Sequence, residues 1–211
     1  MIQKMSEGLG NTCSIFFLTL LIALPLGVVF ALLRMNKNIV ISKLTQFIVS
    51  VLRGTPLMLQ LLAVTYGPFY LFGWGISRNK LIPVVIAFSI NYAAYFSEIY
   101  RGGIESISVG QYEAAAILGY SKAQTFVKII LPQVIRRILP SVTNEIVTLV
   151  KDTSIAFAVS YQEMFTIGKQ IANSQASFMP FIVAGVFYYI FNAAVGFVMG
   201  RAEKAMSYYK Q

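Results

Sequence analysis

The sequence has no histidine, one cysteine (Cys13) and only eight acidic residues among 211. Without histidine or a second cysteine, the chain has no ligand set for zinc or haem, no Ser-His-Asp triad and no internal disulfide. Charged residues make up 12% of the chain, which is about half the share usual in a soluble domain. Most enzyme classes are therefore excluded, and we expect no catalytic residue and no metal site.

Apolar residues make up 57% of the chain, and the mean hydropathy is +0.69. Several uncharged runs are long, and a water-soluble domain of this size has too little interior to bury them. The expected fold class is therefore an all-α integral membrane protein, with residues 1–211 forming one transmembrane domain.

Five transmembrane helices are predicted, at about 11–34, 44–72, 83–101, 141–161 and 178–200, with a cytoplasmic loop at 102–140. The first run is too long for a signal-peptide core, so we expect it to stay in the mature protein. Gly54 and Pro56 interrupt the second helix, which predicts a break or kink that faces protein or a cavity. The fourth helix is polar enough that it must face a bundle interior or an aqueous path.

The net charge of +9 indicates orientation rather than nucleic-acid binding, because the basic residues lie between apolar runs and form no basic patch. With the amino terminus outside and the carboxyl terminus in the cytoplasm, thirteen of the seventeen Lys and Arg residues are inside. Only Lys4, Arg78, Lys80 and Lys169 are then outside. We therefore expect this orientation.

The loop at 102–140 carries the most specific pattern, E-A-A-x3-G-x9-I-x-L-P, formed by Glu113, Ala114, Ala115, Gly119, Ile129, Leu131 and Pro132. Residues 113–118 can form a short helix that breaks at Gly119 and restarts with Ser121 as N-cap. Its small residues let another protein surface approach closely. In this pattern the chain resembles the EAA loop of permease subunits of type I ABC importers, whose EAA residues dock onto ATPase subunits.

Three further segments, 53–56, 98–104 and 151–154, resemble the polar amino acid uptake permeases of that superfamily, of the histidine, arginine and glutamine type. The resemblance implies a multi-pass protein in the cytoplasmic (inner) membrane of a prokaryote. It also implies a second permease, identical or homologous, two ABC ATPase subunits that carry ATP and magnesium, and an extracytoplasmic amino acid binding protein. The other expected contacts are the amino acid and membrane lipid.

The chain itself has no G-x4-G-K-[ST] phosphate loop, because Glu163 stands where Gly168-Lys169 would require the first glycine. We therefore expect a transport subunit that does not hydrolyse ATP and holds no cofactor of its own. ATP-driven closure of the ATPase subunits would move the coupling loop and open the path by alternating access.

An amino acid needs partners for its ammonium and carboxylate in a path of low dielectric. Asp152 is the candidate for the ammonium or for a cationic side chain. The other candidates for the substrate path are Thr55, Asn91, Tyr92, Tyr95, Glu98, Glu145, Thr148 and Ser154. Two alternatives stay open: Lys151 and Asp152 neutralise each other locally, and Glu98 pairs with Arg101 at a helix end.

Other functions remain to be weighed against this interpretation. An ABC permease for another solute, such as a metal chelate or a sulfonate, fits the same loop. A secondary transporter or channel half fits broken helices and intramembrane charges, but gives no reason for the E-A-A loop. A membrane-embedded enzyme lacks evident catalytic groups.

Overall fold

The computed structural model describes residues 2–206, and every regular element within them is helical. In chain order the helices are α1 (Ile2–Arg34), α2 (Ile39–Gly54), α3 (Leu57–Phe72), α4 (Leu81–Glu105), α5 (Val109–Ile117), α6 (Lys122–Gln124), α7 (Leu131–Asp152), α8 (Met164–Gln175) and α9 (Met179–Met206). A π-helical turn (Thr125–Ile130) precedes α7, and a 3₁₀ turn (Thr153–Val159) follows it. The expected all-helical fold is confirmed.

The helix predicted at 44–72 is two helices, α2 and α3, which meet at 107°. The separation falls at Thr55 and Pro56, both in extended conformation. Proline has no N–H to donate and clashes with the preceding turn, so the α2 helix cannot continue through it. The interruption expected from Gly54 and Pro56 is therefore a sharp elbow.

The boundaries around the polar fourth helix also differ from those predicted. Helix α7 starts at Leu131 rather than 141 and ends at Asp152, with the 3₁₀ turn in place of the last α-helical residues. Hydropathy alone missed its first turns, because they carry Arg136 and Arg137. The short helix α8 was not predicted at all, since it is too short and polar to resemble a membrane span.

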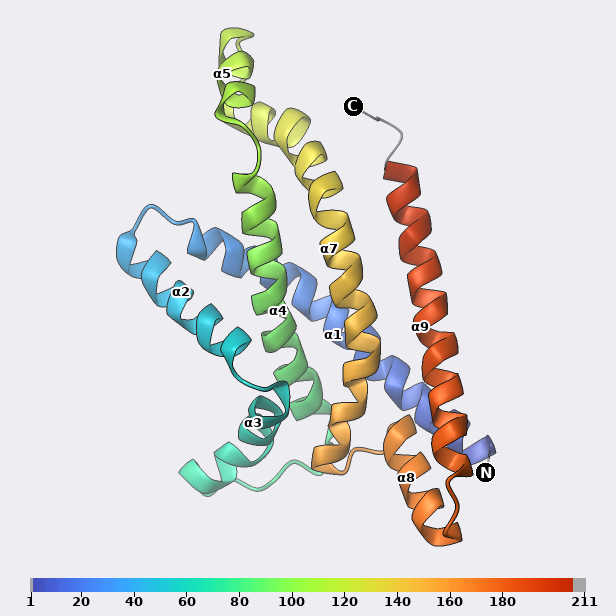
Figure 1. The fold of residues 1–211 in the computed structure, drawn as a ribbon. Coiled ribbons are helices and arrows are strands. Elements are labelled where there is room, and N and C mark those ends of the chain that lie inside the picture. Colours follow the sequence, from blue (N-terminus) through green and yellow to red (C-terminus); the bar gives the residue numbers. More distant parts are fainter. Residues whose placement is uncertain (1, 207–211) are drawn as a thin grey trace.

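Three helices are long and apolar enough to cross a bilayer, namely α1, α4 and α9, and the bent pair α2–α3 raises the number to four within the described residues. Helix α7 does not pass by composition, although it runs alongside α4 for most of its length (Figure 1). In the same view, α5 lies at one end of the bundle, and α3, α8 and the start of α1 lie at the other.

Helix α4 is the centre of the fold. Its Phe88, Tyr92 and Phe96 are among the largest fully buried or nearly buried side chains, and α1 crosses it obliquely (Figure 1). A Cβ added to Gly27 of α1 would lie 2.8 Å from the Cβ of Phe96, so only glycine permits this approach. The arrangement leaves α9 at the edge, with only 6% of its apolar window buried against 67% for α4.

Candidate substrate path and coupling surface

The α2–α3 elbow is held by the side chain of Gln60. Its Nε2 donates to the carbonyl oxygen of Leu52 at 2.7 Å and to the Oγ1 of Thr55 at 2.8 Å. Its Oε1 accepts from the Nδ2 of Asn91 at 3.0 Å, and the same Nδ2 also donates to the oxygen of Leu52. The carbonyl groups freed by the break are thus satisfied by side chains, as a break within a membrane requires.

This network unites two predicted candidates, Thr55 and Asn91, through a residue that the sequence interpretation missed. Gln60 is the first amide in an otherwise apolar segment directly after the break. A lone polar side chain at that place, next to carbonyl groups that Pro56 leaves without helical partners, was the available signal.

A second pair joins α4 to the end of α7. The hydroxyl of Tyr92 donates to the Oδ2 of Asp152 at 2.7 Å, and only 2% of Tyr92 is exposed. Glu145 lies seven residues before Asp152, and therefore on the same face of α7. The two acidic candidates on α7 thus face the α4 tyrosine together.

Arg53, at the last turn of α2, supplies the positive charge of this region. Its guanidinium lies 5.2 Å from the ring centroid of Tyr95, and the Tyr95 hydroxyl donates to the Arg53 oxygen at 3.4 Å. The Glu145 carboxylate is within electrostatic range of Arg53. Asp152, in contrast, is within electrostatic range of its neighbour Lys151. The region thus holds cations and acids together, which are the charges that a zwitterion needs. The sequence interpretation read Arg53 as part of a motif and not as a site residue.

The remaining path candidates are more scattered. Thr148 is half-buried on α7. Ser154 donates to the Lys151 oxygen at 2.8 Å, and both residues line a separate cavity of about 280 Å³ with Phe165, Phe181 and Tyr188, which Asp152 does not line. The structure therefore brings Tyr95 and Glu145 towards Arg53 and joins Tyr92 to Asp152, and it leaves Ser154 apart from them.

Glu98 forms ion pairs with two arginines from different helices. Its carboxylate lies 3.4 Å from Arg34 at the end of α1 and 2.7 Å from Arg101, which also pairs with Glu105 at 2.5 Å. These contacts join α1 to α4 where both helices approach the α5 end of the bundle. The pairs give Glu98 a structural role, and its part in the path stays a prediction.

The E-A-A segment forms a short helix that breaks at Gly119 as predicted, but the helix begins at Val109 rather than at Glu113. Gly119 follows α5 by two residues and has φ +79°. Its N–H donates to the Ala116 oxygen, and the Tyr120 N–H donates to the Ala115 oxygen. These two bonds are a Schellman ending, which requires the left-handed conformation that glycine adopts freely. Ser121 and Gln124 then form a capping box that restarts the chain as a helix.

The surface of this segment is exposed and apolar. Ile117 is 87% exposed and Leu118 is 73% exposed, whereas Ala115 is buried. Glu113 and Ala114 are exposed on the same short helix. Leu131 and Pro132 begin α7 directly after the π-helical turn, so any displacement of α5 has a short covalent route into α7.

Glu163 is a buried carboxylate that the sequence interpretation considered only as a break in a phosphate-loop pattern. It caps α8 by accepting from the N–H groups of Phe165 and Thr166, and it also accepts from the Tyr188 hydroxyl at 2.9 Å. Burial raises the pKa of Glu163 above its ordinary value, and these hydrogen bonds oppose the rise. A carboxylate one residue before a helix was the missed signal.

Comparison with known protein families gives one match over most of the chain. The family described as "binding-protein-dependent transport system inner membrane component" matches residues 23–208. The chain is 35% identical over 210 residues to the nopaline transport system permease protein NocM of Agrobacterium fabrum, covering 95% of this chain and 86% of NocM. It is 34% identical over 201 residues to the arginine transport system permease protein ArtQ of Bacillus subtilis, covering 95% and 91%.

Two solved structures of ABC transporters contain chains with a similar fold. A chain in the crystal structure of an amino acid ABC transporter with histidines is similar with a TM-score of 0.88 and 29% identity, covering 97% of this chain and 94% of that one. A chain of the inward-facing MetNI methionine ABC transporter has a TM-score of 0.72 at 21% identity, covering 98% and 95%, a likeness that concerns the fold alone.

Proposed function

The chain belongs to the family of inner-membrane components of binding-protein-dependent transport systems, and from this premise we propose that it is the permease subunit of an ATP-driven importer for a polar amino acid. The observation that carries the substrate class is the 35% identity to a nopaline permease over almost the whole chain. Relatives named for arginine and glutamine transport support the same class.

The proposed topology has five spans: α1, the bent pair α2–α3, α4, α7 with its 3₁₀ turn, and α9. Helix α7 is too polar to face lipid, but its Val142, Ile146, Leu149 and Val150 are buried against the bundle, and its acids lie near Tyr92. The amino terminus is outside and the carboxyl terminus is cytoplasmic, which keeps most Lys and Arg residues inside. The α5 end of the bundle is then cytoplasmic.

The proposed coupling element is α5 with its exposed apolar ending. Glu113, Ala114, Ala115 and Gly119 form the surface that meets an ATPase subunit, and Leu131 and Pro132 pass its displacement to α7. Two ATPase subunits, which bind ATP and magnesium, a second permease copy or homologue and an external binding protein complete the transporter. ATP-driven closure moves α5 and tilts α4 and α7, so that the path opens to the outside.

The proposed substrate path runs along the shared face of α2, α4 and α7. Asp152 and Glu145 attract the ammonium, Arg53 attracts the carboxylate, and Tyr92 and Tyr95 supply hydroxyl groups. The elbow residues Thr55 and Asn91 set the position of Arg53. Thr148, Ser154 and Glu98 complete the set of candidates from sequence. In a medium of low dielectric, such paired charges hold a zwitterion far better than water-exposed charges do.

The test is reconstitution of the complex with its ATPase subunits and binding protein in proteoliposomes, with separate assays of glutamine and arginine. We expect ATP-dependent uptake and substrate-stimulated ATP hydrolysis. Uptake without ATP would point to a secondary transporter. Stimulation by a metal chelate or sulfonate alone would point to a permease for another solute.

Asp152 gives the sharpest test of the path. Asp152→Asn keeps an oxygen that accepts from Tyr92 but removes the charge, and Asp152→Ala removes both. We expect both variants to raise the KM of uptake at least about tenfold, since roughly 1.4 kcal/mol corresponds to that factor. Unchanged uptake and affinity in Asp152→Asn would remove Asp152 from the path.

A further inference from the structure

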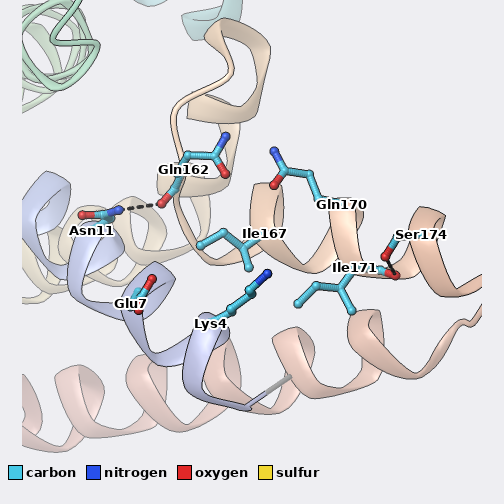
Figure 2. A pocket seen from close by; sticks show the side chains of 8 residues that line it. All are labelled: Lys4, Glu7, Asn11, Gln162, Ile167, Gln170, Ile171 and Ser174. Atoms are coloured by element: carbon cyan, nitrogen blue, oxygen red, sulfur yellow. Dashed lines mark hydrogen bonds between the residues drawn. The ribbon is translucent and has the colours of Figure 1, made fainter.

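An open cavity of about 430 Å³ lies between the first turns of α1 and helix α8 (Figure 2). It is lined by Lys4, Glu7, Asn11, Gln162, Ile167, Gln170, Ile171 and Ser174. None of these residues belongs to the path described above. In the proposed topology the cavity is on the outer face of the membrane, at the end of the bundle opposite α5 (Figure 1).

The walls of the cavity are held by hydrogen bonds between side chains of α1 and the backbone at the start of α8. The Met164 N–H donates to the Oγ1 of Thr12 at 3.2 Å, and the Asn11 Nδ2 donates to the Gln162 oxygen at 2.7 Å (Figure 2). A Cβ on Gly8 would lie 3.0 Å from the Cα of Met164, so the helices are as close as glycine allows. Because α8 is also capped by the buried Glu163, the spacing of the walls does not depend on a ligand.

The charged groups of the cavity, in contrast, have no described ion-pair or hydrogen-bond partner. Lys4 and Glu7 are three residues apart on one face of α1, yet neither forms an ion pair or hydrogen bond with any side chain described between residues 4 and 206. The Gln170 amide is likewise exposed and without a hydrogen bond in this part of the chain. Ile167 and Ile171 form an apolar strip one turn apart on α8. The groups without a described partner are thus one ammonium, one carboxylate and one amide, and they surround an apolar strip.

We propose that this cavity is an external binding site for a free zwitterionic amino acid. The substrate carboxylate pairs with Lys4, and its ammonium pairs with Glu7. Its aliphatic part lies over Ile167 and Ile171, and the Gln170 amide hydrogen-bonds a polar side chain of the substrate. The volume falls within the roughly 300–1,000 Å³ usual for small-molecule pockets. Both charges are solvent-exposed, so we expect weak binding, in the millimolar range.

The site rests on the proposed function, which supplies the amino acid and places this end of the bundle outside. It adds a second, external site to the path around Asp152. An amino acid released near the outer face is held there at raised local concentration before it enters the bundle.

The experiment is a site-specific protection assay on the complete transporter in nanodiscs. Ser174, on the cavity wall, is replaced by cysteine in a Cys13→Ser background, so that it is the only thiol of this chain. A membrane-impermeant maleimide then labels the cysteine with and without glutamine or arginine in the millimolar range. We expect the amino acids to slow labelling of Ser174→Cys at least about threefold. A cysteine at Gly10, an exposed α1 position outside the cavity, is the control and should label at an unchanged rate.

Two further arms test the charge pairing. The double variant Lys4→Gln/Glu7→Gln should lose the protection while the complex keeps its thermal stability and its labelling rate without amino acid. Agmatine, which is arginine without its carboxylate, and glutaramic acid, which is glutamine without its ammonium, should protect less than the intact amino acids.

The proposal is overturned if neither amino acid slows labelling, if the double variant is protected equally well, or if only the binding protein protects the site. The last result would make the cavity a surface for protein docking. ATP-driven uptake measured on the same preparation distinguishes failure of the external site from failure of the proposed function. Uptake without protection defeats the external site alone, whereas the absence of any ATP-driven amino acid uptake defeats the proposed function.

Discussion

Helices α4 and α5 are neighbours in the chain but are stabilised in opposite ways. Helix α4 has thirteen buried residues, and its polar groups Asn91, Tyr92 and Glu98 all have partners on other helices. Helix α5 has one buried residue, Ala115, and is held mainly by local bonds at its end. A substitution in α4 should therefore lower the stability of the fold, whereas one in α5 should lower coupling to the ATPase partner.

The sharpest way to test the α4 side is Gly103→Val, with Gly102→Val as its matched control. A Cβ at Gly103 would collide with Ile138 of α7, whereas one at Gly102 meets nothing. We expect Gly103→Val to cost about 3 kcal/mol of folding free energy, and Gly102→Val to be close to neutral. Thermal unfolding in detergent measures both. Equal melting temperatures would show that α4 and α7 are not packed this closely.

The α5 side is tested by Gly119→Asp. Aspartate tolerates φ +79° better than most residues, so the fold should lose no more than about 1 kcal/mol. The new charge lies beside the exposed Ile117 and Leu118, where an apolar partner surface would have to desolvate it. We expect transport and stimulated ATP hydrolysis to fall at least about a hundredfold, which corresponds to roughly 2.7 kcal/mol of coupling.

Gly75→Asp is the control for Gly119→Asp. It adds the same charge to an exposed glycine in the loop that follows α3, and α3 lies at the end of the bundle opposite α5 (Figure 1). Transport should stay within about twofold of the wild type. Equal losses in the two variants would mean that added charge, and not the place of α5, is responsible.

Gln60→Leu tests whether the polar contacts of α4 also matter for function. The change removes the Nε2 that donates to Leu52 and Thr55 and the Oε1 that accepts from Asn91, which keeps only its bond to the Leu52 oxygen. Loss of these bonds should cost about 2 kcal/mol. It should also lower uptake, because Arg53 is no longer held in place. Gln46→Leu, at a half-buried α2 position whose side chain has no hydrogen bond to the described residues, should have little effect on uptake. The same result for both would exclude Gln60 from the path.

The smallest expected effect concerns the pH dependence of stability at Glu163. Burial holds the pKa of this carboxyl above its ordinary value, so the folded chain binds the proton more tightly than the unfolded chain. Its contribution to stability is therefore fully present at acidic pH and decreases as the pH rises from about 4.5 through the raised pKa. Glu163→Gln should flatten this decrease. Melting temperatures from pH 4 to 8 measure the difference, and parallel curves for both proteins would contradict it.

Several local features could be predicted from sequence because short-range chemistry determines them. Gly119 predicts the helix break after α5, and Ser121 predicts the N-cap of the next helix. Gly54 and Pro56 predict the elbow between α2 and α3. Gln60, Arg53 and Glu163 were missed as site residues because their partners are distant in the chain or on another helix. No local pattern shows that Gln60 faces Asn91, or that Tyr92 faces Asp152.

The sequence by itself determined that this chain is an apolar, all-helical membrane protein with an E-A-A loop, because apolar runs and turn residues act over a few neighbouring positions. Only the tertiary structure decided which apolar helix is the core. By hydropathy α4 and α9 are both spans, yet α4 is buried and α9 is exposed. The tertiary structure also placed α8 against α1 and so formed the cavity between them. Burial is a property of the packing of distant segments, and composition does not record it.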